Sequence, residues 1–315
     1  MDISVVIVSY NSEGFLWENL NSVVKQTKRF KEIVVVDNRS QDRSLGIIAG
    51  FPQVRVIALH ENCGYAGGAN RGIKECTADL ILVANADIIL APDFNASVIE
   101  KFAEDPDITL LSPLILRFDR QTVDSAGQAL SRSLYPLEIG YNRSLSRVNP
   151  GEGPVFSVCG AATVFRRRSL EELELDGEYY DEDFFAFWED LDIGWRAQLY
   201  GFKTYFYPGA IVYHYRSATL KRNFFSRFSL SLSRSTDIKY HLVKNRYLTL
   251  IKNFRFRDFW WTVPFAFLKD IIWVSVLTIS APKNIIRLFR SGRYFKNGFR
   301  KRKMIKEKLK QREAK

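Results

Sequence analysis

Cysteine, histidine and methionine are scarce in this chain of 315 residues, which contains three, three and two of them. The cysteines, Cys63, Cys76 and Cys159, are odd in number, and no two of them have C-x-x-C spacing. Disulfide frameworks and structural zinc sites normally need cysteines in pairs. The sequence therefore excludes both and predicts reduced thiols in a cytosolic protein.

The sequence also lacks two features of secreted and membrane proteins. It starts with a strand-like run, without the basic stretch and apolar core of a secretory signal, so we expect no leader. The most apolar region, residues 259–279, is not the run of roughly 20 apolar residues that spans a bilayer, because Pro264 and the pair Lys269 and Asp270 interrupt it. We therefore expect amphipathic helices in the membrane interface, with packing on the rest of the protein as the alternative.

Basic residues gather at one end of the chain. The net charge is +11, yet residues 283–315 alone hold 14 Lys and Arg against 2 Glu, so the remaining chain is close to neutral. A nucleic-acid-binding protein spreads its basic residues over a folded face. A tail this concentrated favours an anionic membrane surface, where each nearby charge contributes about 1 kcal/mol. We expect residues 304–315 to be disordered.

Strand-like and helix-like patterns alternate in the first third of the chain. β-Branched runs predict buried strands, and apolar spacing predicts helices that begin after Ser12, after Ser40 and at Gly64. This alternation is typical of an α/β fold with a doubly wound, mostly parallel sheet. The strands are expected at residues 2–9, 33–36, 54–57 and 80–84, and residues 113–118 and 123–130 are either strands or loops.

Polar residues follow these strands at the point where each one ends. In a parallel sheet these ends share one edge, where open α/β sheets bind their ligands. A dinucleotide-binding fold is excluded, because residues 9–14 do not supply the G-x-G-x-x-G sequence that it needs. We expect Asp87 to hold a divalent cation at this edge, with capping of a turn as the alternative. The polar residues are Tyr10, Asn11, Asp37, Asn38, Asn85 and Asp87.

Four motifs occur along this part of the chain. They are Val-Ser-Tyr-Asn at 8–11, Val-Asp-Asn-Arg-Ser-Gln-Asp at 36–42, Asn-Cys-Gly-Tyr-Ala-Gly-Gly-Ala-Asn-Arg-Gly at 62–72 and Asn-Ala-Asp at 85–87. In this order they resemble the inverting glycosyltransferases of family 2, which have the GT-A fold, and above all the rhamnosyltransferase-like branch that builds bacterial surface polysaccharides. The resemblance implies a catalytic domain at 1–217, a helical membrane-associating region at 218–303 and a basic tail at 304–315.

The resemblance implies a nucleotide-sugar site. Asp37 would accept a hydrogen bond from the N3–H of a pyrimidine base. Residues 64–70 would wrap the ribose and diphosphate, because glycines allow close approach and a helix N-terminus favours anions. Gly160 would leave room for the sugar. The expected donor-binding residues are Ser9, Tyr10, Asn11, Asp37, Asn38, Gly64, Asn70, Asn85, Ala86 and Gly160.

The resemblance also implies a metal site. Asn85-Ala86-Asp87 takes the place of an Asp-x-Asp motif, with an amide where the first carboxylate would be. Asp87 and His214 are the expected ligands of Mg²⁺ or Mn²⁺. With one carboxylate in this motif, the cation should depend on the substrate phosphates and bind weakly without the nucleotide sugar.

A stretch of acidic and aromatic residues after residue 180 resembles the family's Glu-Asp motif at the start of a helix. Asp190 is the expected general base, which takes the proton of the acceptor hydroxyl, and Glu189 would assist it or orient the acceptor. Trp188 would stack on an acceptor sugar, with core packing as the alternative. Asp192 and Arg196, four residues apart, are expected to form a structural ion pair.

Together these inferences predict a metal-dependent, inverting glycosyltransferase that is peripheral on the cytoplasmic face of the cell membrane. The resemblance implies dTDP-L-rhamnose as the donor, with a UDP-sugar as the alternative, and a glycan on a polyprenyl-diphosphate lipid as the acceptor. Two other hypotheses are a membrane-tethered protein that binds nucleotide sugars without turnover and a nucleic-acid-binding protein that uses the basic tail. Between these, we expect no nucleic-acid partner.

Overall fold

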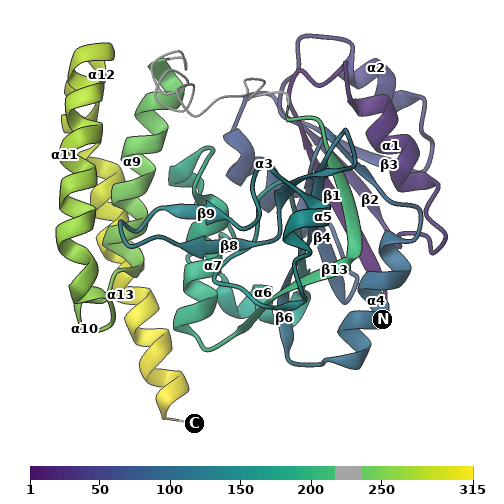
Figure 1. Ribbon diagram of the computed structural model, residues 1–315. Coiled ribbons are helices and arrows are strands. Elements are labelled where there is room, and N and C mark those ends of the chain that lie inside the picture. The colour runs from purple at the N-terminus through teal and green to yellow at the C-terminus, as the bar shows by residue number, and fades with distance from the viewer. Residues whose placement is uncertain (217–235, 315) are drawn as a thin grey trace.

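The computed structural model describes residues 1–216 and 236–314, so the expected domain boundary near residue 217 lies outside the described residues. A mixed sheet with helices on both faces forms the body, and a group of C-terminal helices stands beside it (Figure 1). Along the sheet the strands lie in the order β10 (Arg143–Ser144), β7 (Thr122–Ser125), β6 (Ile108–Arg117), β12 (Ala162–Arg166), β4 (Leu80–Asn85), β1 (Ile3–Ser9), β2 (Ile33–Asp37) and β3 (Val54–Ala58). Outside this order, β13 (Lys203–His214) pairs with β6, with β5 (Ile88–Leu90) and with β11 (Gly153–Pro154). The predicted α/β fold is confirmed.

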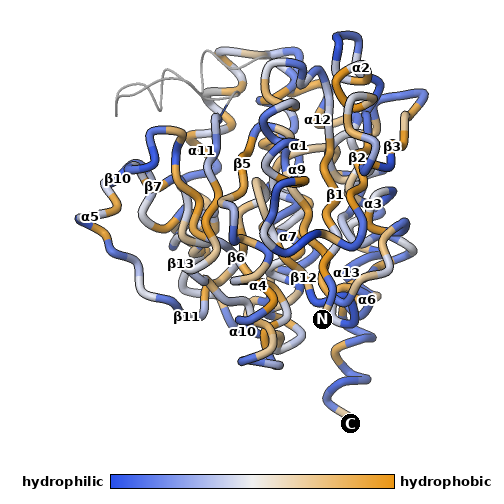
Figure 2. The backbone as a smooth tube through the Cα atoms, turned by 90° about the vertical axis from the view of Figure 1, so that its right-hand side faces the viewer, coloured by the Kyte–Doolittle hydropathy of each residue, from blue (hydrophilic) through white to orange (hydrophobic). Residues whose placement is uncertain are grey.

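The strands β4, β1, β2 and β3 are parallel, as expected, and β12 lies antiparallel to β4. Every residue of β1 and β2 is buried, which explains their uninterrupted apolar sequences. Figure 2 shows these strands as hydrophobic segments in the interior. Ser9 lies opposite Asp37, and Val8 lies opposite Asn85, so the polar residues that follow the strands share one edge.

Helices cover the two faces of the sheet. α1 (Leu16–Val24), α2 (Ser44–Ala49) and α4 (Phe94–Glu104) cover one face, and α3 (Gly64–Lys74), α6 (Arg167–Leu173) and α7 (Glu189–Leu199) cover the other. α1 and α2 begin later than predicted, because the side chains of the two serines do not cap them. The Oγ of Ser12 accepts the N–H of Tyr10 (3.2 Å), and the Oγ of Ser40 accepts the N–H of Asn11 (2.9 Å).

Two regions that the sequence left open have regular structure. Residues 113–118 belong largely to β6, and residues 123–130 contain most of β7 and all of β8 (Gln128–Leu130). β8 and β9 (Pro136–Glu138) form a separate antiparallel hairpin. The remaining short helices of the body are α5 (Leu145–Val148) and η1 (Glu182–Phe184).

The last helix ends at Glu313, so the expected disorder is wrong for residues 304–313. The helices are α9 (Thr236–Asn253), α10 (Phe256–Phe259), η2 (Trp260–Thr262), α11 (Val263–Ser280), α12 (Lys283–Phe289) and α13 (Gly292–Glu313). Ile305 is 2% exposed and packs in the core that α6 and α7 share with the sheet. Lys308 donates to the carbonyl of Glu174 (2.6 Å). The basic tail stays ordered because the body supplies acceptors for its charges.

Buried ion pairs join the C-terminal helices to the body. Lys252 of α9 contacts Asp181 (2.6 Å) and Asp192 (2.7 Å), and Lys301 of α13 contacts Asp181 (2.7 Å). Burial favours the neutral form of Asp181, but the two lysines outweigh it and hold its pKa well below the ordinary value. The predicted pair of Asp192 with Arg196 is also present (3.2 Å). The C-terminal helices are therefore part of the same folded unit.

We predict that Lys252→Ala destabilises the protein by about 3–5 kcal/mol, because it removes the cation that two buried carboxylates share. Lys296→Ala, at an exposed position of α13, is the control. Denaturant unfolding of both variants measures the difference. Asp181 has a lowered pKa, so its contribution is present above its unfolded-state pKa and is lost as the pH falls towards the folded value. Equal midpoints for the two variants would show that the ion pairs contribute nothing.

Candidate active site

A cleft of about 830 Å³ opens at the edge where β1 and β4 end. The loop that follows β1, the end of β4 and the first turn of α7 form its walls, and the hairpin β8–β9 adds Gln128 and Glu138. The predicted residues that line this cleft are Tyr10, Asn11, Asn38, Gly64, Asn85, Ala86, Asp87, Gly160, Trp188, Glu189, Asp190 and His214. The structure thus brings most of the expected donor residues, and all of the expected metal and base residues, into one cavity.

Ser9 and Asp37 do not line the cleft but are buried at the strand ends beside it. The Oδ2 of Asp37 accepts the N–H of Ser40 (2.9 Å). Its Oδ1 and the Oγ of Ser9 have no hydrogen-bond partner within the described part of the chain. A buried carboxylate oxygen without a partner is costly, so a donor from a bound base would fit this position.

Asn70 was expected to bind the donor, but the structure places it outside the cleft. Its amide donates to the carbonyl of Tyr180 (2.7 Å) and to Glu182 (3.1 Å), and its oxygen accepts the N–H groups of Tyr179 (3.2 Å) and Tyr180 (2.9 Å). Asn70 therefore holds the segment before η1 against α3. The sequence could not reveal these contacts, because the partners lie more than a hundred positions away.

The glycines of α3 are needed for close packing. A Cβ on Gly64, whose φ is +74°, would lie 2.2 Å from the carbonyl oxygen of Phe185. A Cβ on Gly72 would lie 2.2 Å from Val6, and one on Gly68 would lie 2.9 Å from Val8. The spacing of these last two glycines lets α3 lie directly on β1.

The two predicted metal ligands are neighbours. The Nε2 of His214 lies 3.3 Å from the Oδ1 of Asp87, and its Nδ1 lies 2.8 Å from buried Asp124. Burial lowers the pKa of His214, but hydrogen bonds to Asp124 and Asp87 outweigh it and raise the pKa to about 9. Asp124 thereby fixes the imidazole with Nε2 towards Asp87, which is how outer carboxylates orient metal-binding histidines.

This donor pair fits a divalent cation that a diphosphate completes. Among residues 1–216 and 236–314, no group of three or more His, Cys, Asp and Glu side chains could hold a metal by itself. A cation at Nε2 would displace the proton that His214 carries. Asp124 was not predicted from the sequence. A carboxylate inside a candidate strand, here β7, indicates that a buried group pairs with it, and this signal could have identified Asp124.

Asp190 lies in the first turn of α7 and accepts three hydrogen bonds. The donors are the N–H of Gly160 (2.9 Å), the amide of Gln128 (2.9 Å) and the N–H of Leu191 (2.8 Å). Burial raises the pKa of Asp190, while these three bonds lower it. Burial and the charge of Asp190 raise the pKa of Glu189 well above its ordinary value. Asp190 is therefore the better base of the two and Glu189 the better proton donor.

Trp188 was expected to stack on a sugar, but it is 7% exposed and packs edge-to-face on Tyr135, with ring centroids 5.3 Å apart. This favours the core-packing alternative. Phe185 and Phe187 line the same wall and are 36% and 39% exposed, so they offer the aromatic surface instead.

The loop before α7 has an unusual backbone that α9 stabilises. Phe185, Phe187 and Trp188 have φ angles of 67°, 70° and 73°, which are unfavourable for residues with side chains. The buried amide of Asn245 in α9 donates to the carbonyls of Phe184 (3.0 Å), Ala186 (2.8 Å) and Phe187 (2.7 Å). One side chain of the C-terminal helices thus supports the wall of the cleft.

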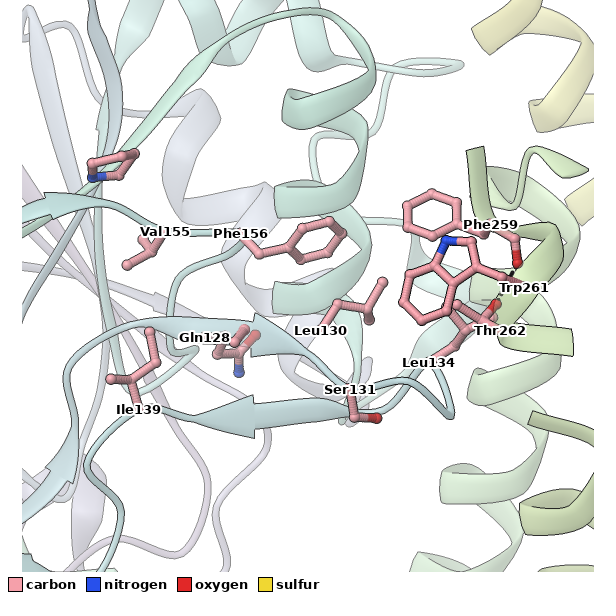
Figure 3. Close-up of a pocket in the computed structure, with 12 residues that line it drawn as sticks. Gln128, Leu130, Ser131, Leu134, Ile139, Val155, Phe156, Phe259, Trp261 and Thr262 are labelled. Carbon is pink, nitrogen blue, oxygen red and sulfur yellow. Dashed lines mark hydrogen bonds between the residues drawn. The ribbon is translucent and has the colours of Figure 1, made fainter. Parts of the chain in front are cut away.

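A second cavity, of about 330 Å³, lies between the hairpin β8–β9 and the helices α10 and η2 (Figure 3). Leu130, Phe156 and Trp261 are among its lining residues, and Gln128 lines both this cavity and the cleft. The hairpin therefore separates the two cavities, with Gln128 at the point where they meet.

We predict that Asn245→Ala speeds amide hydrogen exchange in residues 184–188 by about tenfold, because three buried carbonyls lose a donor worth roughly 1–3 kcal/mol. Asn284→Ala is the matched control, since that buried amide donates to the carbonyl of Thr236 at the start of α9 (2.6 Å). Exchange mass spectrometry compares both variants with the native protein. Unchanged protection of this loop in Asn245→Ala would show that other contacts hold it.

Several known proteins are similar to this chain in sequence. Poly-beta-1,6-N-acetyl-D-glucosamine synthases of Staphylococcus epidermidis and Staphylococcus aureus are 23% and 24% identical over 212 residues, which is 66% of this chain and 48% of theirs. The chain thus spans about half the length of these curated relatives.

Two solved structures share the fold. GalNAc-T7 with UDP, GalNAc and Mn²⁺ has a TM-score of 0.60 and 19% identity over 80% of this chain and 48% of that one. The mannosyltransferase PcManGT from Pyrobaculum calidifontis, in complex with GDP-Man and Mn²⁺, has a TM-score of 0.55 and 15% identity over 98% and 86%. The sequence profile described as Glycosyl transferase family 2 matches residues 4–174, more than half of the chain. The protein therefore belongs to glycosyl transferase family 2.

Proposed function

We propose that this glycosyltransferase is a metal-dependent, inverting enzyme that adds a sugar from a nucleotide diphosphate to a glycan in cell-surface polysaccharide synthesis. The observation that carries the proposal is that one cleft contains both the Asp87 and His214 pair and the carboxylate of Asp190. One end supplies donors for a cation and the other a partly buried base. A protein that binds nucleotide sugars without turnover would have no need of the base.

In the proposed reaction, Asp190 accepts the proton of the acceptor hydroxyl. The hydroxyl oxygen forms a bond to the anomeric carbon from the face opposite the diphosphate, and the bond from that carbon to the diphosphate oxygen breaks. A bound Mg²⁺ or Mn²⁺ would neutralise the charge of the leaving diphosphate. Asp87 and His214 would hold that cation, so the reaction needs no acid on the leaving group.

For the donor we propose a pyrimidine nucleotide sugar, with dTDP-L-rhamnose first and a UDP-sugar second. The unpartnered Oδ1 of Asp37, within the described residues, supports a base that presents an N–H group. The preference for rhamnose rests on the sequence resemblance alone. The relatives described above carry the name of synthases of poly-beta-1,6-N-acetyl-D-glucosamine, and one structural neighbour contains UDP. Both observations keep the UDP-sugar alternative open.

We further propose that the acceptor is lipid-linked and that α10, η2 and α11 lie on an anionic membrane surface. Within the described residues, one stretch, Phe256–Ser280, is long and apolar enough by length and composition to cross a membrane. Phe267 is 67% exposed and Ile279 is 82% exposed. An apolar surface of this kind on a folded body marks an interaction site.

The charged pair in the middle of this stretch, Lys269 and Asp270, faces the body. Asp270 forms an ion pair with buried Arg246 of α9, and the Nζ of Lys269 lies 5.7 Å from the ring of Tyr135. One side of α11 therefore packs on the protein while the other is exposed and apolar. The sequence left open whether this region lies in the membrane interface or packs on the rest of the protein. In this arrangement one side of α11 packs on the protein and the other side is free for the interface, which supports a helix that lies in the membrane interface.

We predict that Asp190→Ala retains donor binding but loses transfer, by about 10²–10⁴-fold, because the carboxylate acts on the acceptor and not on the nucleotide. Product formation should be screened with dTDP- and UDP-sugars in the presence of Mg²⁺ or Mn²⁺. Calorimetric titration with the accepted donor measures binding. Turnover that survives the substitution would refute the assignment of the base.

We predict that the double variant Phe267→Glu/Ile279→Glu no longer sediments with vesicles that contain anionic lipid, because two charges would enter the apolar interface. Leu45→Glu/Val56→Glu, at exposed apolar positions of α2 and β3, is the matched control and should sediment like the native protein. If both double variants bind vesicles equally well, α11 is not the membrane surface. Native binding to DNA in the same assay would favour the nucleic-acid hypothesis instead.

A further inference from the structure

A second carboxyl group is linked to the proposed base through one amide. Gln128 and Glu138 face each other across the hairpin β8–β9. The Nε2 of Gln128 donates to the Oε1 of Glu138 (2.9 Å) and to the Oδ2 of Asp190 (2.9 Å). Figure 3 shows Gln128 on β8, beside the cavity that the hairpin covers. No motif in the sequence pointed to either residue.

The chemistry of the three groups fixes the orientation of the amide. An ionised carboxylate only accepts hydrogen bonds, whereas a Gln side chain has two N–H donors on one nitrogen. That nitrogen must therefore face both acids. Gln128 is 2% exposed, so its amide is largely shielded from solvent. Ser125 donates a further hydrogen bond to the Oε2 of Glu138.

We propose that Gln128 and Glu138 set the basicity of Asp190 and thereby the pH at which the site removes the acceptor's proton. The inference rests on the proposed function, in which Asp190 is the base. Gln128 stabilises the ionised carboxylate as a donor, and Glu138, once ionised, makes it a stronger base by repulsion. Both act through Asp190 and are positioning residues.

The two acids ionise in a defined order. Burial, together with the charge of Asp190, outweighs the lowering effects of Ser125, Gln128 and Arg216 and raises the pKa of Glu138 to about 7. Asp190 has three donors on its charged form and ionises first. Glu138 then ionises near pH 7, next to a carboxylate that is already charged.

Among the described residues, five other ionisable groups interact with this pair, and one of them can titrate in the same range. Burial raises the pKa values of Tyr65, Tyr180 and Cys159 well above their ordinary values, so these three groups do not titrate near neutral pH. Burial also raises the pKa of Glu189, so the experiment must separate Glu189 from Glu138. The five groups are Tyr65, Cys159, Tyr180, Glu189 and Arg216.

The guanidinium of Arg216 keeps its positive charge throughout the neutral range. Burial lowers the pKa of Arg216, but the charge of Asp124 outweighs burial and raises the pKa above its ordinary value. Arg216 therefore acts on Glu138 as a constant charge and adds no step of its own to a pH profile.

The pH dependence of kcat/KM reports the ionisations of the free enzyme. In the native protein, below the His214 pKa of about 9, the value should rise in two steps, the first as Asp190 loses its proton and the second near pH 7 as Glu138 ionises. Glu138→Gln removes the charge but retains an acceptor for Gln128, so the step near pH 7 should disappear. Glu138→Asp retains the charge and should retain a second step.

Two further substitutions remove hydrogen-bond donors from the acids. Ser125→Ala removes a donor from Glu138 and should move the upper step to higher pH, which a step caused by Glu189 would not do. Gln128→Leu removes a donor from ionised Asp190 and another from Glu138. The pKa of Asp190 should therefore rise, and the lower step should move upward by about one pH unit.

Gln198→Leu is the matched control for Gln128→Leu, because its amide donates to the carbonyls of Val155 (3.0 Å) and Phe156 (2.9 Å) and not to an acid. It should keep both steps at their native pH. Thermal unfolding of each variant shows which ones fold, and Ser125→Ala alone tests the inference if Glu138→Gln does not.

The outcomes separate this inference from the proposed function. If Asp190→Ala turns over, the base assignment is wrong and the inference falls with it. If Asp190→Ala is inactive while Glu138→Gln keeps the step near pH 7, or Gln128→Leu leaves the lower step in place, only the inference is wrong.

Discussion

The buried ion pairs of Asp181 and Asp192 with Lys252 and Lys301 are the constraint on which the rest of the structure depends. They lie on both sides of the loop that leads into α7, so they fix where that helix begins. A buried charge needs its partner, which forces α9 and α13 to stay docked. The first turn of α7, with Asp190, takes its position from this contact.

The same helices have a second role at the cleft. Asn245 of α9 supports the backbone of Phe185 and Phe187, whose positive φ angles would otherwise be unfavourable. The opposite side of the helical group presents the exposed apolar residues of α11. A contact of that surface would therefore act on elements that hold the wall of the cleft.

Electrostatics divides the cleft into two ends. At one end, Asp87 and Asp124 raise the pKa of His214 enough to keep it protonated at neutral pH. At the other, burial raises the pKa of Asp190 and Glu189, while donors keep Asp190 the more acidic of the two. The proposed cation donors and the proposed base line the same cavity, as simultaneous binding of a diphosphate and an acceptor hydroxyl would require.

The sequence by itself determined the parallel strands and the shared edge, because burial of β1 and β2 requires apolar runs and polar residues can stand only where the strands end. The sequence also predicted that Asp87 and Asp190 belong to the candidate site. Only the tertiary structure revealed the roles of Asn70 and of the glycines of α3, and the helical structure of the basic tail. It also revealed Asp124 as the partner of His214, and Gln128 and Glu138 as the groups linked to Asp190. These depend on contacts between residues far apart in the chain, which local patterns of hydrophobicity and charge do not encode.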